Sequence, residues 1–169
     1  MDIVSSTINN FSEFISSSKR NNDCRLYSYV FKLNFPHQYH LINELGTQNS
    51  TMIFFKEPNG KQSFIALGSV IDLIGDGERK ISSITKRFSE WKNKLINNWD
   101  DIDLNFVPII VSAVKFDGKR NSEKWVDFPS ITFYIPEIIL LKSEEKSYCV
   151  FNFFLKDENQ KEIILNDFK

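Results

Sequence analysis

Residues 150–155, Val-Phe-Asn-Phe-Phe-Leu, place large apolar side chains at both odd and even positions. Successive side chains of a β-strand point to opposite faces of a sheet, so a strand of this composition is apolar on both faces and needs a covering layer on each. The chain contains sixteen Phe residues but only two Met residues. Because each Phe buries a large area, the sequence predicts an aromatic core packed between layers.

Six segments rich in β-branched and aromatic residues and bounded by turn residues predict strands. They are residues 24–33, 51–56, 62–74, 107–116, 131–142 and 147–156. Pro58 and the pair Asn59-Gly60 separate the second segment from the third, and this turn chemistry predicts an antiparallel hairpin. A short polar turn, residues 143–146, joins the last two segments.

Two segments place apolar side chains at helical spacing. Residues 5–18 predict a short N-terminal helix, and residues 79–99 predict one long amphipathic helix, preceded by a turn at Gly75-Asp76-Gly77. Hairpins combined with one long helix predict an α+β fold, in which antiparallel sheet of about six or more strands is covered by the two helices. No repeat or linker divides the chain, so we expect a single domain over residues 1–169.

Charge and composition exclude several classes of function. Lys and Arg total 21 against 22 Asp and Glu, for a net charge of −1, and acidic residues interleave the one basic cluster, Lys115, Lys119, Arg120 and Lys124 beside Trp125. We therefore expect no nucleic-acid partner. The N-terminus has no signal-peptide pattern, and the apolar runs are too short to span a bilayer. The sequence predicts a cytoplasmic protein without a membrane partner.

Three groups of residues contain side chains of the types found in reactive or metal-binding sites. His37, His40 and Glu44 have a ligand-like spacing, but Pro36 precedes them and no fourth ligand is near in sequence. Cys24 and Cys149 form no CxxC motif and lie in strand-like runs typical of buried, inert thiols, so neither a disulfide nor a zinc site is expected.

The third group follows the long predicted helix. Asp100, Asp101 and Asp103 lack the ligand series of a calcium loop and are interpreted as a solvated helix exit. We predict no catalytic, cofactor-binding or metal-binding residue in this chain.

Several segments, taken in order, resemble the N-terminal region of the isochorismate synthases of menaquinone biosynthesis, a family of chorismate-using enzymes. The resemblance is carried by the helix with Trp91 and by five short segments: Phe54-Phe55-Lys56-Glu57-Pro58, Phe64-Ile65-Ala66-Leu67-Gly68, Val111-Ser112-Ala113-Val114-Lys115-Phe116, Trp125-Val126-Asp127-Phe128-Pro129 and Phe133-Tyr134-Ile135-Pro136. It covers about residues 24–156. Each segment is short, so the specificity lies in their order and spacing.

The chain departs from the family pattern at two places. Ser112-Ala113 stands where the family has Gly-Gly, and Glu137 stands where an Arg usually follows Ile-Pro. These departures indicate either a divergent member or a relaxed role for that edge. The Leu-Leu-Glu-Ser-like segment of the related anthranilate synthases is absent, which favours the isochorismate branch.

The resemblance implies a non-catalytic scaffold. In that family the general base, the general acid and the Mg²⁺-binding carboxylates belong to a C-terminal chorismate-binding half, which would be the missing partner of this domain. Mg²⁺ is thus implied for the full-length isomerase and no cofactor for this chain, which alone is expected to be inactive. We further expect an exposed apolar patch at residues 150–155, against the missing half or open to self-association.

Two alternatives stay open at this point. The chain could be a free-standing module that binds a small apolar ligand in an aromatic pocket between sheet and helix. It could also be the same domain from another chorismate enzyme, such as a salicylate or anthranilate synthase.

Overall fold

A computed structural model describes residues 3–17, 25–35, 38–45, 51–75, 80–102, 110–114, 129–155 and 159–168. Four α-helices lie within these ranges: α1 (Ile3–Ser17), α2 (Gln38–Leu45), α3 (Lys80–Lys92) and α4 (Asn159–Asp167), with a short 3-10 helix, η1 (Trp99–Asp101). The strands are β1 (Arg25–Lys32), β2 (Met52–Lys56), β3 (Gln62–Leu67), β4 (Ile71–Gly75), β5 (Ile96–Asn97), β6 (Val111–Val114), β7 (Ile131–Ile135), β8 (Ile138–Ser143) and β9 (Lys146–Leu155).

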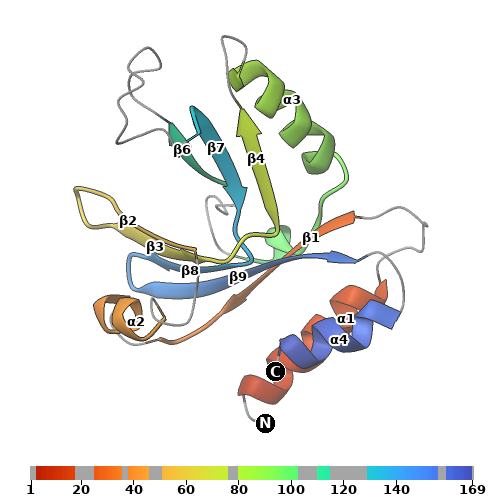
Figure 1. Ribbon diagram of the computed structural model, residues 1–169. Helices are drawn as coiled ribbons and strands as arrows, with labels where there is room; N and C mark the ends of the chain where they lie inside the picture. Colours follow the sequence, from red (N-terminus) through yellow and green to blue (C-terminus); the bar gives the residue numbers. More distant parts are fainter. Residues whose placement is uncertain are drawn as a thin grey trace.

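The strands form two sheets rather than one (Figure 1). The larger has six strands in the order β2-β3-β8-β9-β1-β5, and the smaller has three in the order β4-β7-β6. Helices α1 and α4 lie side by side on one side of the six-stranded sheet, whereas the second sheet and α3 stand on the other (Figure 1). The α+β class is confirmed. The antiparallel-only prediction is wrong in one detail, because β5 pairs with β1 in parallel.

Two predicted strands are each divided in the structure. Residues 62–74 form β3 and β4, and residues 131–142 form β7 and β8, so that each segment leaves one sheet and enters the other. The two breaks lie opposite each other, because the N–H of Glu137 donates to the carbonyl of Leu67 (3.1 Å) and the N–H of Val70 donates to that of Ile135 (2.8 Å). Gly68 has a φ of +62°, a conformation that favours glycine and turns the chain out of the sheet.

We expect Gly68→Ala to lower the free energy of unfolding by about 2 kcal/mol and Gly60→Ala by about 1 kcal/mol, measured by urea denaturation. Both glycines have positive φ, at +62° and +72°. They differ in their surroundings, because a Cβ at Gly68 would lie 3.0 Å from Oε2 of Glu137, whereas at Gly60 it would meet nothing nearer than 3.9 Å. Equal losses would contradict a close approach between the two breaks.

The long helix predicted over residues 79–99 is shorter in the structure. Helix α3 ends at Lys92, and the 13-residue α3 is therefore shorter than the 15-residue α1. The apolar spacing continued past Lys92, but Ile96 pairs with Tyr27 of β1 and Trp99 begins η1. Packing against the sheet thus overrides the helical pattern. The short N-terminal helix is confirmed as α1, and α4 occupies a segment for which no helix was predicted.

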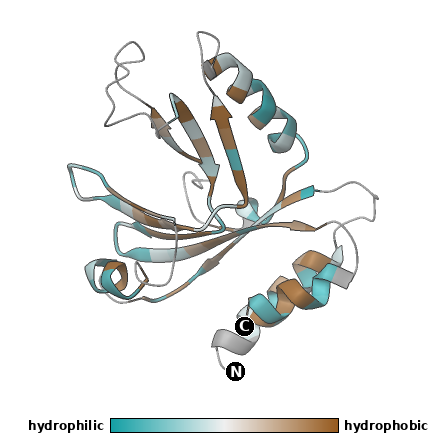
Figure 2. Cartoon of the chain, in the orientation of Figure 1, coloured by the Kyte–Doolittle hydropathy of each residue, from teal (hydrophilic) through white to brown (hydrophobic). Residues whose placement is uncertain are grey.

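Both faces of β9 are covered within this chain. Phe151 and Phe153 lie in an aromatic cluster with Phe11 of α1, while Tyr148 and Val150 lie in a cluster on the opposite face of the sheet. Phe151 and Phe153 are only 7% and 6% exposed, and Val150 is fully buried. The predicted exposed patch at residues 150–155 is therefore wrong. Figure 2 shows that much of this sheet consists of hydrophobic residues.

The remaining exposed large apolar side chains are spread over separate elements. They include Phe55 on β2, Ile74 on β4, Ile81 on α3, Val114 on β6 and Ile163 on α4. Scattered exposed apolar residues are normal on a protein surface. They do not form the self-association patch that the sequence predicted on β9.

Candidate functional site

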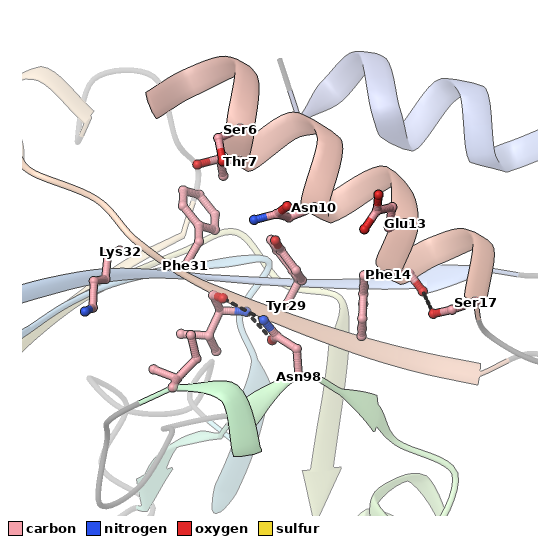
Figure 3. Close-up of a pocket in the computed structure, with 12 residues that line it drawn as sticks. Ser6, Thr7, Asn10, Glu13, Phe14, Ser17, Tyr29, Phe31, Lys32 and Asn98 are labelled. Carbon is pink, nitrogen blue, oxygen red and sulfur yellow. Dashed lines mark hydrogen bonds between the residues drawn. The ribbon is translucent and has the colours of Figure 1, made fainter. Parts of the chain in front are cut away.

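A pocket of about 830 Å³ lies between α1 and the edge of the six-stranded sheet (Figure 3). One wall is a face of α1 whose side chains recur at three- and four-residue steps: Ser6, Thr7, Asn10, Glu13, Phe14 and Ser17. The floor is the end of β1, and Asn98 and Ile102 close the far side. The apolar face of α1, with Phe11 and Ile15, packs on the core, which leaves this polar face for the pocket.

Aromatic and polar groups meet in this pocket. Tyr29 and Phe31 point from β1 toward α1, whereas the side chain of Lys32 is directed away from α1 (Figure 3). Tyr29 is 5% exposed, and its ring lies 5.1 Å from that of Phe14 and 5.0 Å from that of Phe11. Phe168, after α4, stacks on Phe11 at 3.9 Å. The aromatic floor of the pocket is thus continuous with the core.

Asn98 holds the open edge of β1. The N–H of Val30 donates to Oδ1 of Asn98, and Nδ2 of Asn98 donates to the carbonyl of Val30, both at 2.8 Å (Figure 3). The neighbouring Trp99 donates from Nε1 to Oγ of Ser28 at 3.3 Å. The segment that follows β5 is therefore fixed to β1 by side chains where strand pairing stops.

Other buried polar side chains hold main-chain groups together. Nδ2 of Asn152 on β9 donates to the carbonyl of Pro136 at 2.8 Å, next to the break between β7 and β8. Gln38, at the start of α2, donates from Nε2 to the carbonyls of Ser63 (3.3 Å) and Leu140 (3.2 Å) and accepts from Oγ of Ser63. These groups position strands and a helix.

Only some of the candidates from the sequence lie within the described residues. His40 and Glu44 lie on the exposed side of α2, and Asp100 is exposed in η1. His37, Cys24, Asp103, Asp76, Gly77 and the basic cluster around Trp125 lie outside the described residues. Among the described residues, no three His, Cys, Asp or Glu side chains gather in a way that could hold a metal ion.

Cys149 is buried in β9, as the sequence predicted. Burial raises the pKa of its thiol from 9.0 to about 12, because the thiolate would lose its hydration. The thiolate is the reactive form, so this residue is held in its inert state.

We expect Cys149 to resist iodoacetamide at pH 8 in the folded protein and to react readily in urea, as followed by peptide mass spectrometry. The free energy of unfolding should also fall as pH rises from about 9 towards 12, because the thiol ionises over this range in the unfolded chain only. Cys149→Ser should remove the part of this pH dependence that the Cys149 thiol contributes. Rapid labelling of the folded protein would contradict the burial of the thiol.

The pocket was not predicted from the sequence. Its available signal was the polar stripe of α1, which alternates with the apolar stripe at helical spacing. The other wall of the pocket depends on residues 98–102, which were predicted to be the end of a helix and the loop that follows it. No helix within the described residues has the length and apolar character needed to cross a membrane.

Comparisons with known proteins agree with this architecture. The family model described as chorismate binding enzyme matches residues 12–169. No curated protein matches the chain by sequence. Among solved structures, the chain is similar to MenF, the menaquinone-specific isochorismate synthase from Escherichia coli, with a TM-score of 0.54 and 14% sequence identity.

This structural match is a likeness of fold, and the two chains differ in extent. It covers 98% of this chain but 33% of the MenF chain, so the chain spans about a third of the length of that structure. The family match covers nearly all of the present sequence. The chain belongs to the chorismate-binding enzyme family.

Proposed function

We propose that this chain is the N-terminal, non-catalytic scaffold domain of an isochorismate synthase-like enzyme, and that it braces a separate chorismate-binding half. The complete cytoplasmic enzyme would convert chorismate to isochorismate in menaquinone biosynthesis. The observation that carries this proposal is the family match over residues 12–169 combined with a fold that corresponds to a third of an isochorismate synthase. Residues 1–169 would form one domain of that enzyme.

The use of buried polar groups supports a scaffold. Asn152, Gln38 and Asn98 each bond to main-chain groups of other elements. Such bonds fix the relative positions of strands and helices, whereas catalytic groups are directed toward a substrate. These buried bonds thus favour a domain that supports a neighbouring site over one that carries out chemistry itself.

Mg²⁺ is part of this proposal only for the complete enzyme. The described residues of the chain offer no clustered set of carboxylates, His or Cys, so they do not fit a Mg²⁺ site and we assign none to this domain. The groups that activate water and move the hydroxyl around the chorismate ring would come from the other half.

Two alternative functions make different predictions. A salicylate or anthranilate synthase would use the same family fold, and the product formed by the complete enzyme distinguishes these activities. A module for a small apolar ligand is less favoured, because the α1 wall of the pocket presents Ser6, Thr7, Asn10 and Glu13.

The test is turnover of chorismate by the 169-residue protein with Mg²⁺, followed by chromatography of the products. We expect no isochorismate, salicylate or anthranilate above the level without protein. A thermal-shift screen with apolar ligands serves as the companion measurement, and we expect no stabilisation. Clear turnover by this chain alone would overturn the scaffold proposal.

A further inference from the structure

One buried side-chain oxygen in the described part of the chain has no hydrogen-bond partner. It is Oδ1 of Asn152 on β9, a residue that is fully buried. The other end of this side chain is satisfied, because Nδ2 donates to the carbonyl of Pro136. Buried polar atoms nearly always bond to a protein group or to an ordered water molecule. The oxygen of Asn152 therefore needs a donor.

Ser28 of β1 lies beside Asn152. The two residues are directly opposite each other in the antiparallel pairing of β1 with β9, and Ser28 is also fully buried. The N–H of Asn152 donates to Glu137 on the β8 side, so Asn152 and Ser28 form a non-hydrogen-bonded pair. The side chains of such a pair share one face of the sheet, and their Cβ atoms are about 4.5–5.5 Å apart.

A second amide–serine pair shows what direct contact looks like in this protein. Oε1 of Gln38 accepts from Oγ of Ser63, and Nε2 of Gln38 donates to the carbonyls of Ser63 and Leu140. Protein groups thus satisfy both ends of the Gln38 amide. Ser28 and Asn152 are neighbours without such a bond, so the two side-chain oxygens lie farther apart than a direct hydrogen bond allows.

The hydrogen bonds on either side of this gap run in the same direction. Nε1 of Trp99 donates to Oγ of Ser28 at 3.3 Å, and the hydroxyl of Ser28 can in turn donate its own proton. Asn152 offers Oδ1 as an acceptor and donates onward to Pro136. One molecule that accepts from Ser28 and donates to Asn152 completes the series, and hydrogen bonds in such a series strengthen one another.

We propose that a single buried water molecule is bound between Ser28 and Asn152, where it accepts from Oγ of Ser28 and donates to Oδ1 of Asn152. A metal ion does not fit, because the described residues contain no cluster of His, Cys, Asp or Glu to hold one and an unpaired buried charge is costly. The completed series joins η1, β1, β9 and the break between β7 and β8. It thereby links the two sheets, whether or not the proposed function is correct.

A high-resolution crystal structure of the 169-residue protein tests this site directly. We expect an ordered water oxygen within about 3.2 Å of both Oγ of Ser28 and Oδ1 of Asn152. A direct bond from Ser28 to Asn152 would overturn the proposal, and so would the lack of ordered water between them.

Water–protein NOE spectroscopy tests the same site in solution. The side-chain amide protons of Asn152 should show an NOE to water with the sign of a long-lived contact, and those of Gln38 should show none. Ser28→Ala removes one of the two partners of the water and should abolish the Asn152 signal, whereas the matched control Ser63→Ala should leave it unchanged. Absence of the signal in the parent protein, or full intensity in Ser28→Ala, would contradict the bridge.

Discussion

Replacing Phe11 by Ala is expected to lower the free energy of unfolding by about 3–5 kcal/mol, the largest loss of any single substitution considered for this protein. Phe11 is fully buried. Its ring lies 3.9 Å from that of Phe168, 5.0 Å from that of Tyr29 and 5.7 Å from that of Phe153. It thereby joins α1, α4 and the six-stranded sheet, and an alanine would leave a cavity between all three. Urea denaturation followed by Trp fluorescence measures the loss.

Phe55→Ala is the matched control. Phe55 also contacts an aromatic ring, that of Phe64 at 5.4 Å, but it is 48% exposed on the edge strand β2. We expect a loss of about 1 kcal/mol, because only part of its surface is removed from water. If the two substitutions cost the same, α1 and α4 would not be packed on the sheet through Phe11.

Asn152→Ala is expected to cost about 2–3 kcal/mol, the second large effect. Asn152 lies on β9 and is fully buried. It contacts the break at which the chain passes from β7 in one sheet to β8 in the other. Its Nδ2 donates to the carbonyl of Pro136 and its N–H to that of Glu137, both at 2.8 Å. The side-chain bond is lost in the variant, and the Pro136 carbonyl loses this donor.

Asn152→Asp sharpens this test. The carboxylate keeps the shape of the amide but has no donor for the carbonyl of Pro136, whereas the neutral carboxyl has an O–H that can donate to it. Burial and this bond both favour the neutral form. The folded-state pKa of the new Asp should therefore exceed its unfolded value, so the loss of stability relative to the parent protein should be smallest at low pH and grow as pH rises above about 4. Asn10→Asp, on the exposed face of α1, should change stability by less than about 0.5 kcal/mol. A flat pH profile for Asn152→Asp would contradict its burial.

The strands were predicted well because the alternation of side chains and the residues of a turn can be recognised within a few consecutive positions of the sequence. The β2–β3 hairpin, with Gly60 in its turn, is confirmed on this basis. The breaks at Gly68 and Pro136 were missed because both flanking segments remain apolar. Only the pairing of Glu137 with Leu67, seventy residues apart, reveals where the chain changes sheets.

The covering of β9 shows a similar limit. Its two apolar faces were recognised from the sequence, and so was their need for two layers. The layers were assigned to a missing partner because α4 carried no clear helical signal and the second sheet was not foreseen. In the structure, Phe11 and Phe168 pack on one face, and Trp99 packs against the cluster that contains Val150 on the other.

The bonds between Asn98 and β1 could not be predicted from the sequence for a related reason. Asn98 lies sixty-eight residues from Val30, and it was placed near the end of a helix that in fact stops at Lys92. Nothing in the residues next to Asn98 in the sequence indicates that its side chain bonds to another strand. Its function depends on the parallel pairing of β5 with β1, which a single sequence does not reveal.

The coding DNA that surrounds this sequence should identify the chorismate-binding half. Isochorismate formation should then be measured with Mg²⁺ for this chain, for that half, and for the two together at equal concentration. The scaffold account predicts no turnover by this chain and a rate for the mixture that exceeds the rate of the other half alone by at least about tenfold. An equal rate with and without this chain would contradict it.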